Sequence, residues 1–100
     1  MTQAPRSRRR ARPRPATPPS IPVLRVQTGV RMEKRILKVL KALAEYHDLT
    51  LGDLLEGIVL HAFEGKPPFG PESLALIVDL KRVYKLELDA RASHRLVEDA

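Results

Sequence analysis

The chain has 100 residues, a formal net charge of +6, 43% hydrophobic residues, nine prolines and no cysteine. This length allows one small domain with tails, and the lack of cysteine excludes disulfides, thiolate metal sites and thiol nucleophiles. No apolar run approaches the roughly 20 residues that a membrane-spanning helix needs. We therefore expect a soluble, cytoplasmic protein with no membrane partner.

Residues 1–20 form an arm of unusual composition. Of the 18 Lys and Arg residues in the chain, six lie in this arm, which leaves twelve to balance the twelve Asp and Glu residues that follow. The six are Arg6, Arg8, Arg9, Arg10, Arg12 and Arg14. Dense like charge, five prolines and few large apolar side chains predict a disordered arm that is attracted to polyanions. The alternative is a solubilising tail. A targeting signal is a weaker interpretation, because no apolar segment follows the arginines.

Residues 23–32 alternate between apolar and polar side chains, which predicts a β-strand. One face carries Leu24, Val26, Val30 and Met32, and the other carries Arg25, Gln27, Gly29 and Arg31. Thr28 interrupts the apolar face.

From Glu33 the pattern changes to the period of a helix, which we expect to end near residues 46–48. Its apolar stripe is Ile36, Leu37, Leu40, Leu43 and Ala44, with Lys34, Lys38 and Lys41 on another face. Thr50, followed by Asp53, predicts the N-cap of a second helix, and Gly65 with two prolines predicts its end. The apolar stripe of the second helix is Leu51, Leu54, Leu55, Ile58, Val59, Ala62 and Phe63.

Residues 66–100 form a predicted helical extension. After a Pro/Gly connector, Pro71 suits the first position of a helix over about residues 72–85. Its expected buried stripe is Leu74, Ile77, Val78 and Leu80. Asp89 suits the cap of a last short helix that would run to Val97. The chain thus divides into the arm (1–20), a strand with two helices (21–65) and the extension (66–100).

A single strand leaves its backbone amides and carbonyls unpaired, and nothing later in the chain has similar β character. The simplest partner is a second copy, so we expect a homodimer with Leu24, Val26, Val30 and Met32 in its core. Arg25, Gln27 and Arg31 of both copies would then point outward from a two-stranded ribbon. Such a ribbon fits the major groove of DNA, where Arg reads guanine and Gln reads adenine.

The segments Val30-Arg31-Met32-Glu33, Leu40, Leu43-Ala44, Leu49-Thr50 and Asp53-Leu54-Leu55 occur in a characteristic order and spacing. Over residues 23–65 the chain resembles ribbon-helix-helix repressors of the Arc/MetJ/CopG superfamily. The resemblance implies a mainly α fold in which one strand pairs across a dimer. It also implies base reading by Arg25, Gln27 and Arg31, and phosphate binding by the start of the second helix, at Thr50, Leu51 and Gly52.

The chain departs from the pattern of this family in three ways. Gly29 stands at an outward strand position where the family usually has a polar side chain, and Leu51 also replaces a polar residue. The extension lies beyond the region of resemblance. These departures put in doubt how much sequence the ribbon reads.

Other candidate sites have simpler interpretations. Lys34 and Lys38 are candidate phosphate contacts, although lysines on a helix often form only a solvated face. His47, His61 and His94 match no metal-ligand spacing, so we expect no metal, and the position of His47 near a helix end fits the helix dipole. Ser93-His94 lacks any oxyanion-hole motif. We therefore expect no enzyme activity and no cofactor.

Two classes of function remain. The first is a homodimeric, sequence-specific DNA-binding regulator of repressor type. The alternative is a dimeric adaptor or antitoxin-like protein-binding module, whose basic arm binds RNA, membrane or acidic partners. In either class the extension is a candidate site for a protein partner.

Overall fold

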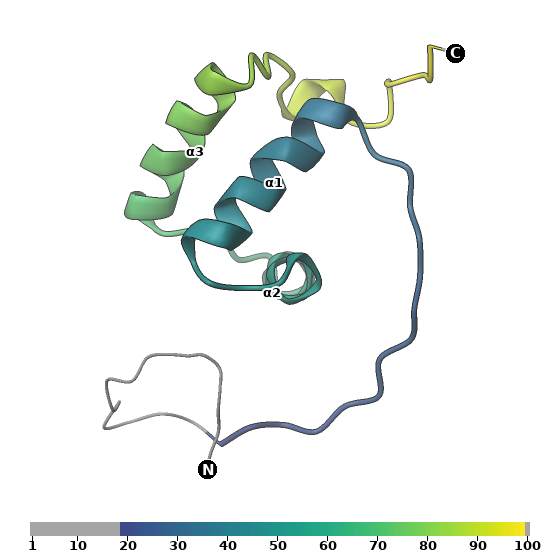
Figure 1. Ribbon diagram of the computed structural model, residues 1–100, viewed down its shortest axis with the longest axis vertical. Coiled ribbons are helices and arrows are strands. Elements are labelled where there is room, and N and C mark those ends of the chain that lie inside the picture. Colours follow the sequence, from purple (N-terminus) through teal and green to yellow (C-terminus); the bar gives the residue numbers. More distant parts are fainter. Residues whose placement is uncertain (1–18, 100) are drawn as a thin grey trace.

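The computed structural model describes residues 19–99, and within them the chain is mainly helical (Figure 1). It comprises α1 (Lys34–Tyr46), α2 (Leu51–Phe63), α3 (Pro71–Val83) and a short 3₁₀ turn, η1 (Ala90–Ala92). Residues 1–18 of the arm, which was predicted to be disordered, lie outside the described residues. None of the described helices combines the length and apolar character needed to span a bilayer.

Each α-helix begins at a residue that suits a helix start. Glu33 caps α1, because one carboxylate oxygen accepts hydrogen bonds from the amides of Arg35 and Ile36, both at 2.9 Å. Thr50 caps α2 through its hydroxyl, which accepts from the amide of Asp53 at 3.0 Å. Pro71 is the first residue of α3. The predicted starts of all three helices are confirmed.

The three α-helices also end in the same way. A residue with positive φ follows each helix, and the next amide donates back to a carbonyl oxygen five residues earlier, which is the Schellman arrangement. The residues are Asp48 (φ 58°), Gly65 (φ 69°) and Lys85 (φ 58°), and the bonds are Leu49 to Ala44 (2.9 Å), Lys66 to His61 (2.9 Å) and Leu86 to Lys81 (2.8 Å). Only Gly65 is free of the steric cost that an L-residue meets at this φ.

The core lies along α1, which packs against α2 on one side and α3 on the other (Figure 1). Its centre is Leu43, which is only 1% exposed, with Ala44 and Leu54 beside it. Six half-buried residues from the helices and the α2–α3 connector surround this centre: Leu40, Ile58, Phe69, Leu76, Ile77 and Leu80. Val39 is also buried, although it lies outside the predicted stripe of α1.

The extension departs from the predictions in two places. Leu74 and Val78 are more than half exposed, and Leu76 packs against the core with Ile77 and Leu80 instead. Near the C-terminus, Asp89 accepts from the amide of Arg91 as a cap should, but the helix that follows ends at Ala92. The prediction of a helix to Val97 was wrong, because Leu96 and Val97 remain exposed and a helix this short needs packing to be stable.

The segment predicted to be a strand is extended but forms no strand within residues 19–99. It runs apart from the helices before it enters α1 (Figure 1). None of the backbone hydrogen bonds found among the described residues involves residues 21–32. The physical reason is that the described part of the chain offers no second strand with which this segment could pair.

Candidate nucleic-acid interface

The predicted dimer core is exposed in the single chain. Leu24 is 99% exposed, Val26 85% and Val30 73%, whereas Met32 is half-buried where the segment meets α1. Large apolar side chains on one short segment are seldom left in water unless another surface covers them. The structure contains no second surface that covers these side chains, so their predicted place in a dimer core stays a prediction.

Two of the three predicted base-reading residues form ion pairs with carboxylates of the same chain. Arg25 donates to Glu56 of α2 from Nε (2.9 Å) and Nη2 (2.7 Å). This pairing raises the pKa of Arg25 and lowers that of Glu56, in both cases mainly through the side-chain hydrogen bond. Arg31 donates through the same two nitrogens to Glu98, which raises the pKa of Arg31.

The orientation of Arg25 differs from the predicted ribbon. The sequence pattern predicts that Leu24 and Val26 face the helices while Arg25 faces away, but Arg25 contacts α2 and Leu24 lies in solvent. An isolated extended segment has no pleated neighbour to fix its faces, so the nearest carboxylate determines where Arg25 lies. Gln27 is exposed, and a Cβ at Gly29 would meet nothing within 4 Å.

The predicted phosphate site lies at the start of α2. The first turn of a helix offers free amides, here those of Leu51 and Gly52, which attract anions. Gly52 is exposed and Leu51 half-buried. However, the amide of Asp53 is already bound by Thr50, and the Asp53 carboxylate lies in the same turn. A phosphate here would meet a like charge, which the helix dipole only partly offsets.

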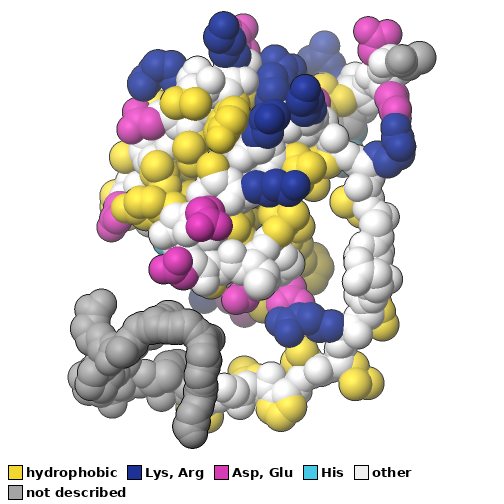
Figure 2. Space-filling view, viewed as in Figure 1, with side chains coloured by type: hydrophobic (Ala, Val, Ile, Leu, Met, Phe, Trp, Pro, Cys, Tyr) yellow, Lys and Arg dark blue, Asp and Glu magenta, His cyan; other side chains and the backbone are white. Residues whose placement is uncertain are grey.

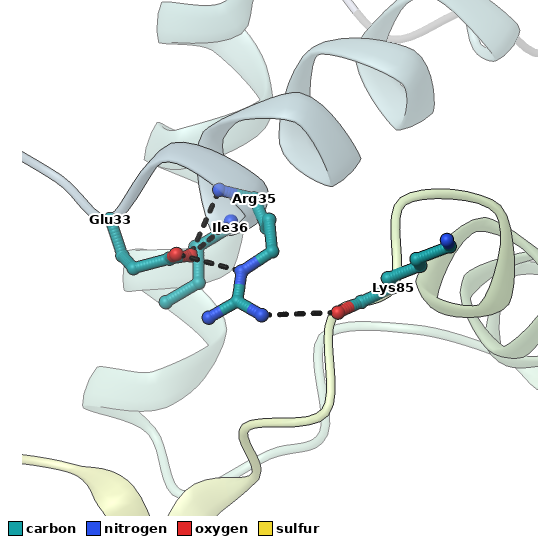
Figure 3. A network of polar contacts seen from close by, with 4 residues as sticks. All are labelled: Glu33, Arg35, Ile36 and Lys85. Carbon is teal, nitrogen blue, oxygen red and sulfur yellow. Dashed lines mark hydrogen bonds and ion pairs between the residues drawn. The ribbon is translucent and has the colours of Figure 1, made fainter.

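The predicted phosphate-binding lysines lie in the first half of α1, away from the start of α2. Lys34 and Lys38 are both exposed, and Lys38 Nζ lies 5.8 Å from the ring centroid of Tyr84, which follows α3. Arg35, one turn earlier, donates from Nη1 to the carbonyl oxygen of Lys85 at 3.1 Å (Figure 3). The structure therefore brings the end of α3 against the first half of α1.

Three features of this region escaped the sequence reasoning. Glu56 and Glu98 were not recognised as partners of the strand arginines, because pairs 31 and 67 residues apart leave no local signal. The sequence also carried no indication that the end of α3 packs against the first half of α1. The cluster Lys81-Arg82-Val83-Tyr84-Lys85 did carry a signal, since three of its five residues are basic.

Two of the three histidines make local contacts. His47 Nε2 lies 3.0 Å from the Ser73 hydroxyl oxygen, and His61 Nδ1 lies 2.7 Å from the carbonyl oxygen of Gly57. Within residues 19–99 no three His, Asp or Glu side chains gather in a way that could hold a metal ion.

Comparison with protein-family models, with curated proteins and with solved structures finds no match to this chain.

Proposed function

We propose that the chain is a homodimeric DNA-binding regulator in which residues 23–32 of two copies pair as an antiparallel ribbon. The observation that carries this proposal is the unpaired extended segment, with Leu24, Val26 and Val30 exposed directly before two capped helices. Pairing would satisfy its backbone and cover its apolar face in one step.

The surface of α2 supports the same arrangement. Val59, Leu60 and Phe63 are exposed at 42%, 63% and 80%. In a dimer these side chains and the apolar face of the ribbon form surfaces that two copies bury against each other. The ribbon would then carry Arg25, Gln27 and Arg31 on its outer face, where paired hydrogen bonds to base edges give sequence preference.

The ion pairs of the single chain have to open for this to happen. Arg25 would leave Glu56 and Arg31 would leave Glu98. All four side chains are exposed, so water screens both ion pairs and they contribute little to stability. Burial of three large apolar side chains per copy contributes roughly 1.5–3 kcal/mol for each side chain that is fully buried, and this gain also has to offset the entropy lost on association. The loss of the two ion pairs therefore does not oppose the ribbon.

The test compares binding to two kinds of duplex at one fixed salt concentration. Duplexes are first selected from a randomised library on the wild-type chain, and affinity for them is compared with affinity for random duplex. Arg31→Ala should reduce this ratio about 5-fold to 100-fold, because a paired contact to a base discriminates by about 1–3 kcal/mol. Arg95→Ala is the matched control, since it removes the same charge from an exposed residue of the extension.

Two results would contradict the proposal. One is a library from which the wild-type chain enriches no sequence. The other is an Arg31→Ala variant whose ratio equals that of the wild type.

The second candidate function is a dimeric adaptor or antitoxin-like module that binds protein. The observation in its favour is that carboxylates of the chain itself engage Arg25 and Arg31. The exposed apolar residues of α3, Leu74, Val78 and Val83, would offer such a partner a surface. A wild-type dimer that enriches no DNA sequence would favour this function.

A further inference from the structure

The strongest unassigned feature is a basic surface where α1 begins and α3 ends. We define it by six residues, and call it the α1–α3 basic surface: Lys34, Lys38, Lys41, Lys81, Arg82 and Lys85. Two contacts hold its halves together, namely Lys38 against the Tyr84 ring and Arg35 with the carbonyl oxygen of Lys85 (Figure 3). Lys and Arg side chains gather over this end of the face seen in Figure 2.

These cations are available to a partner. Five of the six residues are exposed, and Lys81 is half-buried. Within the described residues only Arg82 takes part in an ion pair, with Asp79 at 3.1 Å and mostly exposed. Two carboxylates of the same region are engaged elsewhere: Glu33 by the start of α1 and Arg35, and Asp89 by Arg91. The ion pairs of the described residues therefore leave five of the six cations unpaired.

Helix α2, on the other side of α1, offers no such group of cations. It contains no Lys or Arg but carries Asp53 and Glu56, and Glu64 follows it. Arg25 pairs with Glu56 and Lys66 pairs with Glu64, so Asp53 is the carboxylate of this region that has no ion pair among the described residues. A polyanion approaching the chain is therefore attracted to the α1–α3 basic surface more than to α2.

We infer that the α1–α3 basic surface binds the sugar-phosphate backbone of duplex DNA beside the site read by residues 23–32, so that the extension enlarges the DNA-binding surface. This inference rests on the proposed function. One half of the α1–α3 basic surface lies on α1, and α1 follows the reading segment directly after Glu33. Lysines suit this role, because they act as mobile point charges that fix position without reading sequence.

The size of the surface fits a short run of phosphates. On α1 it extends from Lys34 to Lys41, which is about 10 Å at 1.5 Å per residue. The same length of B-DNA spans about three base pairs, at about 3.4 Å each. A polar and largely lysine-based surface next to the reading segment matches a duplex backbone better than an apolar protein partner.

The test uses two full-length variants with the same loss of charge. Arg82→Gln with Lys85→Gln removes two cations from the surface, both in the extension. Lys66→Gln with Arg95→Gln removes two exposed cations elsewhere in the extension and leaves the Arg91–Asp89 ion pair in place. Affinity for a 30-base-pair random duplex and for a single-stranded RNA of equal length is measured by fluorescence anisotropy over a range of KCl concentrations. Circular dichroism checks that both variants keep their helices.

For the surface variant, the slope of log affinity against log salt should become shallower by about 1–2, because each lost phosphate contact removes roughly 0.9. The control should change the slope by less than half of this. If both variants bind the duplex as the wild type does, the inference is overturned and the proposed function stands. If the wild type binds no duplex, both fail. If the surface variant loses only RNA binding, duplex DNA is the wrong partner.

Discussion

The three helices and the segment that precedes them differ in whether their backbone and apolar side chains find partners within the chain. Each helix pairs its own backbone and ends in a hydrogen-bonded cap, and α1 and α2 also begin with a side-chain cap, so the helices form in a single chain. In residues 21–32 the backbone finds no such partner among the described residues, and the apolar side chains meet solvent. Leu43 and Leu24 show the contrast in one residue type, at 1% and 99% exposed. The helical part is self-sufficient, whereas the segment has no partner surface among the described residues.

The largest expected effect contrasts these two leucines. Leu43→Ala should destabilise the fold by about 2–5 kcal/mol, because it leaves a cavity in the centre of a small core. Leu24→Ala should leave the monomer unchanged and destabilise only a dimer, since its side chain has no contact to lose in the single chain. Denaturant unfolding at two protein concentrations separates the two effects. A concentration-independent loss of stability in Leu24→Ala would contradict the assignment.

The second prediction breaks the pairing alone. Val30→Asp should raise the dimer dissociation constant at least about 100-fold, because the ribbon would bury two unpaired carboxylates. The helices should persist, since Val30 is 73% exposed in the single chain. Sedimentation measures the first effect and circular dichroism the second. Val23→Asp is a nearby control that lies beyond the predicted inward positions.

A Val30→Asp chain that remains dimeric would show that another surface joins the copies. The exposed residues of α2 and α3 are then the candidates, which would favour the adaptor function.

The sequence predicted the self-sufficient part well, because its signals are local. Thr50 with Asp53 marks the start of α2, and Pro71 marks that of α3. Gly65 marks the end of α2, but Asp48 and Lys85 adopt positive φ without any such signal. Helix bounds follow from caps and periodicity, which involve only neighbours along the chain.

Tertiary choices were harder to predict from the sequence. Helix α3 has two apolar stripes, Leu76 with Ile77 and Leu80, and Leu74 with Val78, and the sequence does not say which of them meets α1. The same limit applies to the candidate site. Alternation in residues 23–32 indicates which residues share a face, but the partners of Arg25 and Arg31 come from distant parts of the chain.

The third prediction concerns the junction of the two regions, where Glu33 caps α1. The amide of Ile36 and the side chain of Arg35 lower the pKa of Glu33. A lowered pKa in the folded state stabilises the fold above the ordinary glutamate pKa, and this contribution disappears as pH falls through the lowered value. Glu33→Gln should therefore melt at a lower temperature near neutral pH, and its difference from wild type should shrink as the pH falls below the ordinary glutamate pKa and through the lowered one.

A matched variant separates this effect from capping in general. Thr50→Ala removes a neutral cap, so it should cost about 1 kcal/mol at every pH. Thermal melts across the pH range measure both. A Glu33→Gln difference that stays constant with pH would show that the charge of Glu33 does not stabilise α1.

The smallest expected effect tests whether α2 packs against a second copy at Gly57. Gly57 lies inside α2, and a Cβ built there meets nothing within 4 Å. Because glycine costs about 1 kcal/mol relative to alanine in a helix, Gly57→Ala should stabilise the isolated helical part by roughly 0.5–1 kcal/mol. The comparison is Gly65→Ala, where φ is +69° and the substitution should destabilise by about 1 kcal/mol.

In a dimer that packs two α2 helices closely at Gly57, the added methyl would instead weaken association. Stability measured in dilute and in concentrated solution therefore gives opposite signs if Gly57 lies at the interface. A gain at both concentrations would place the second copy elsewhere and leave residues 23–32 as the joining element.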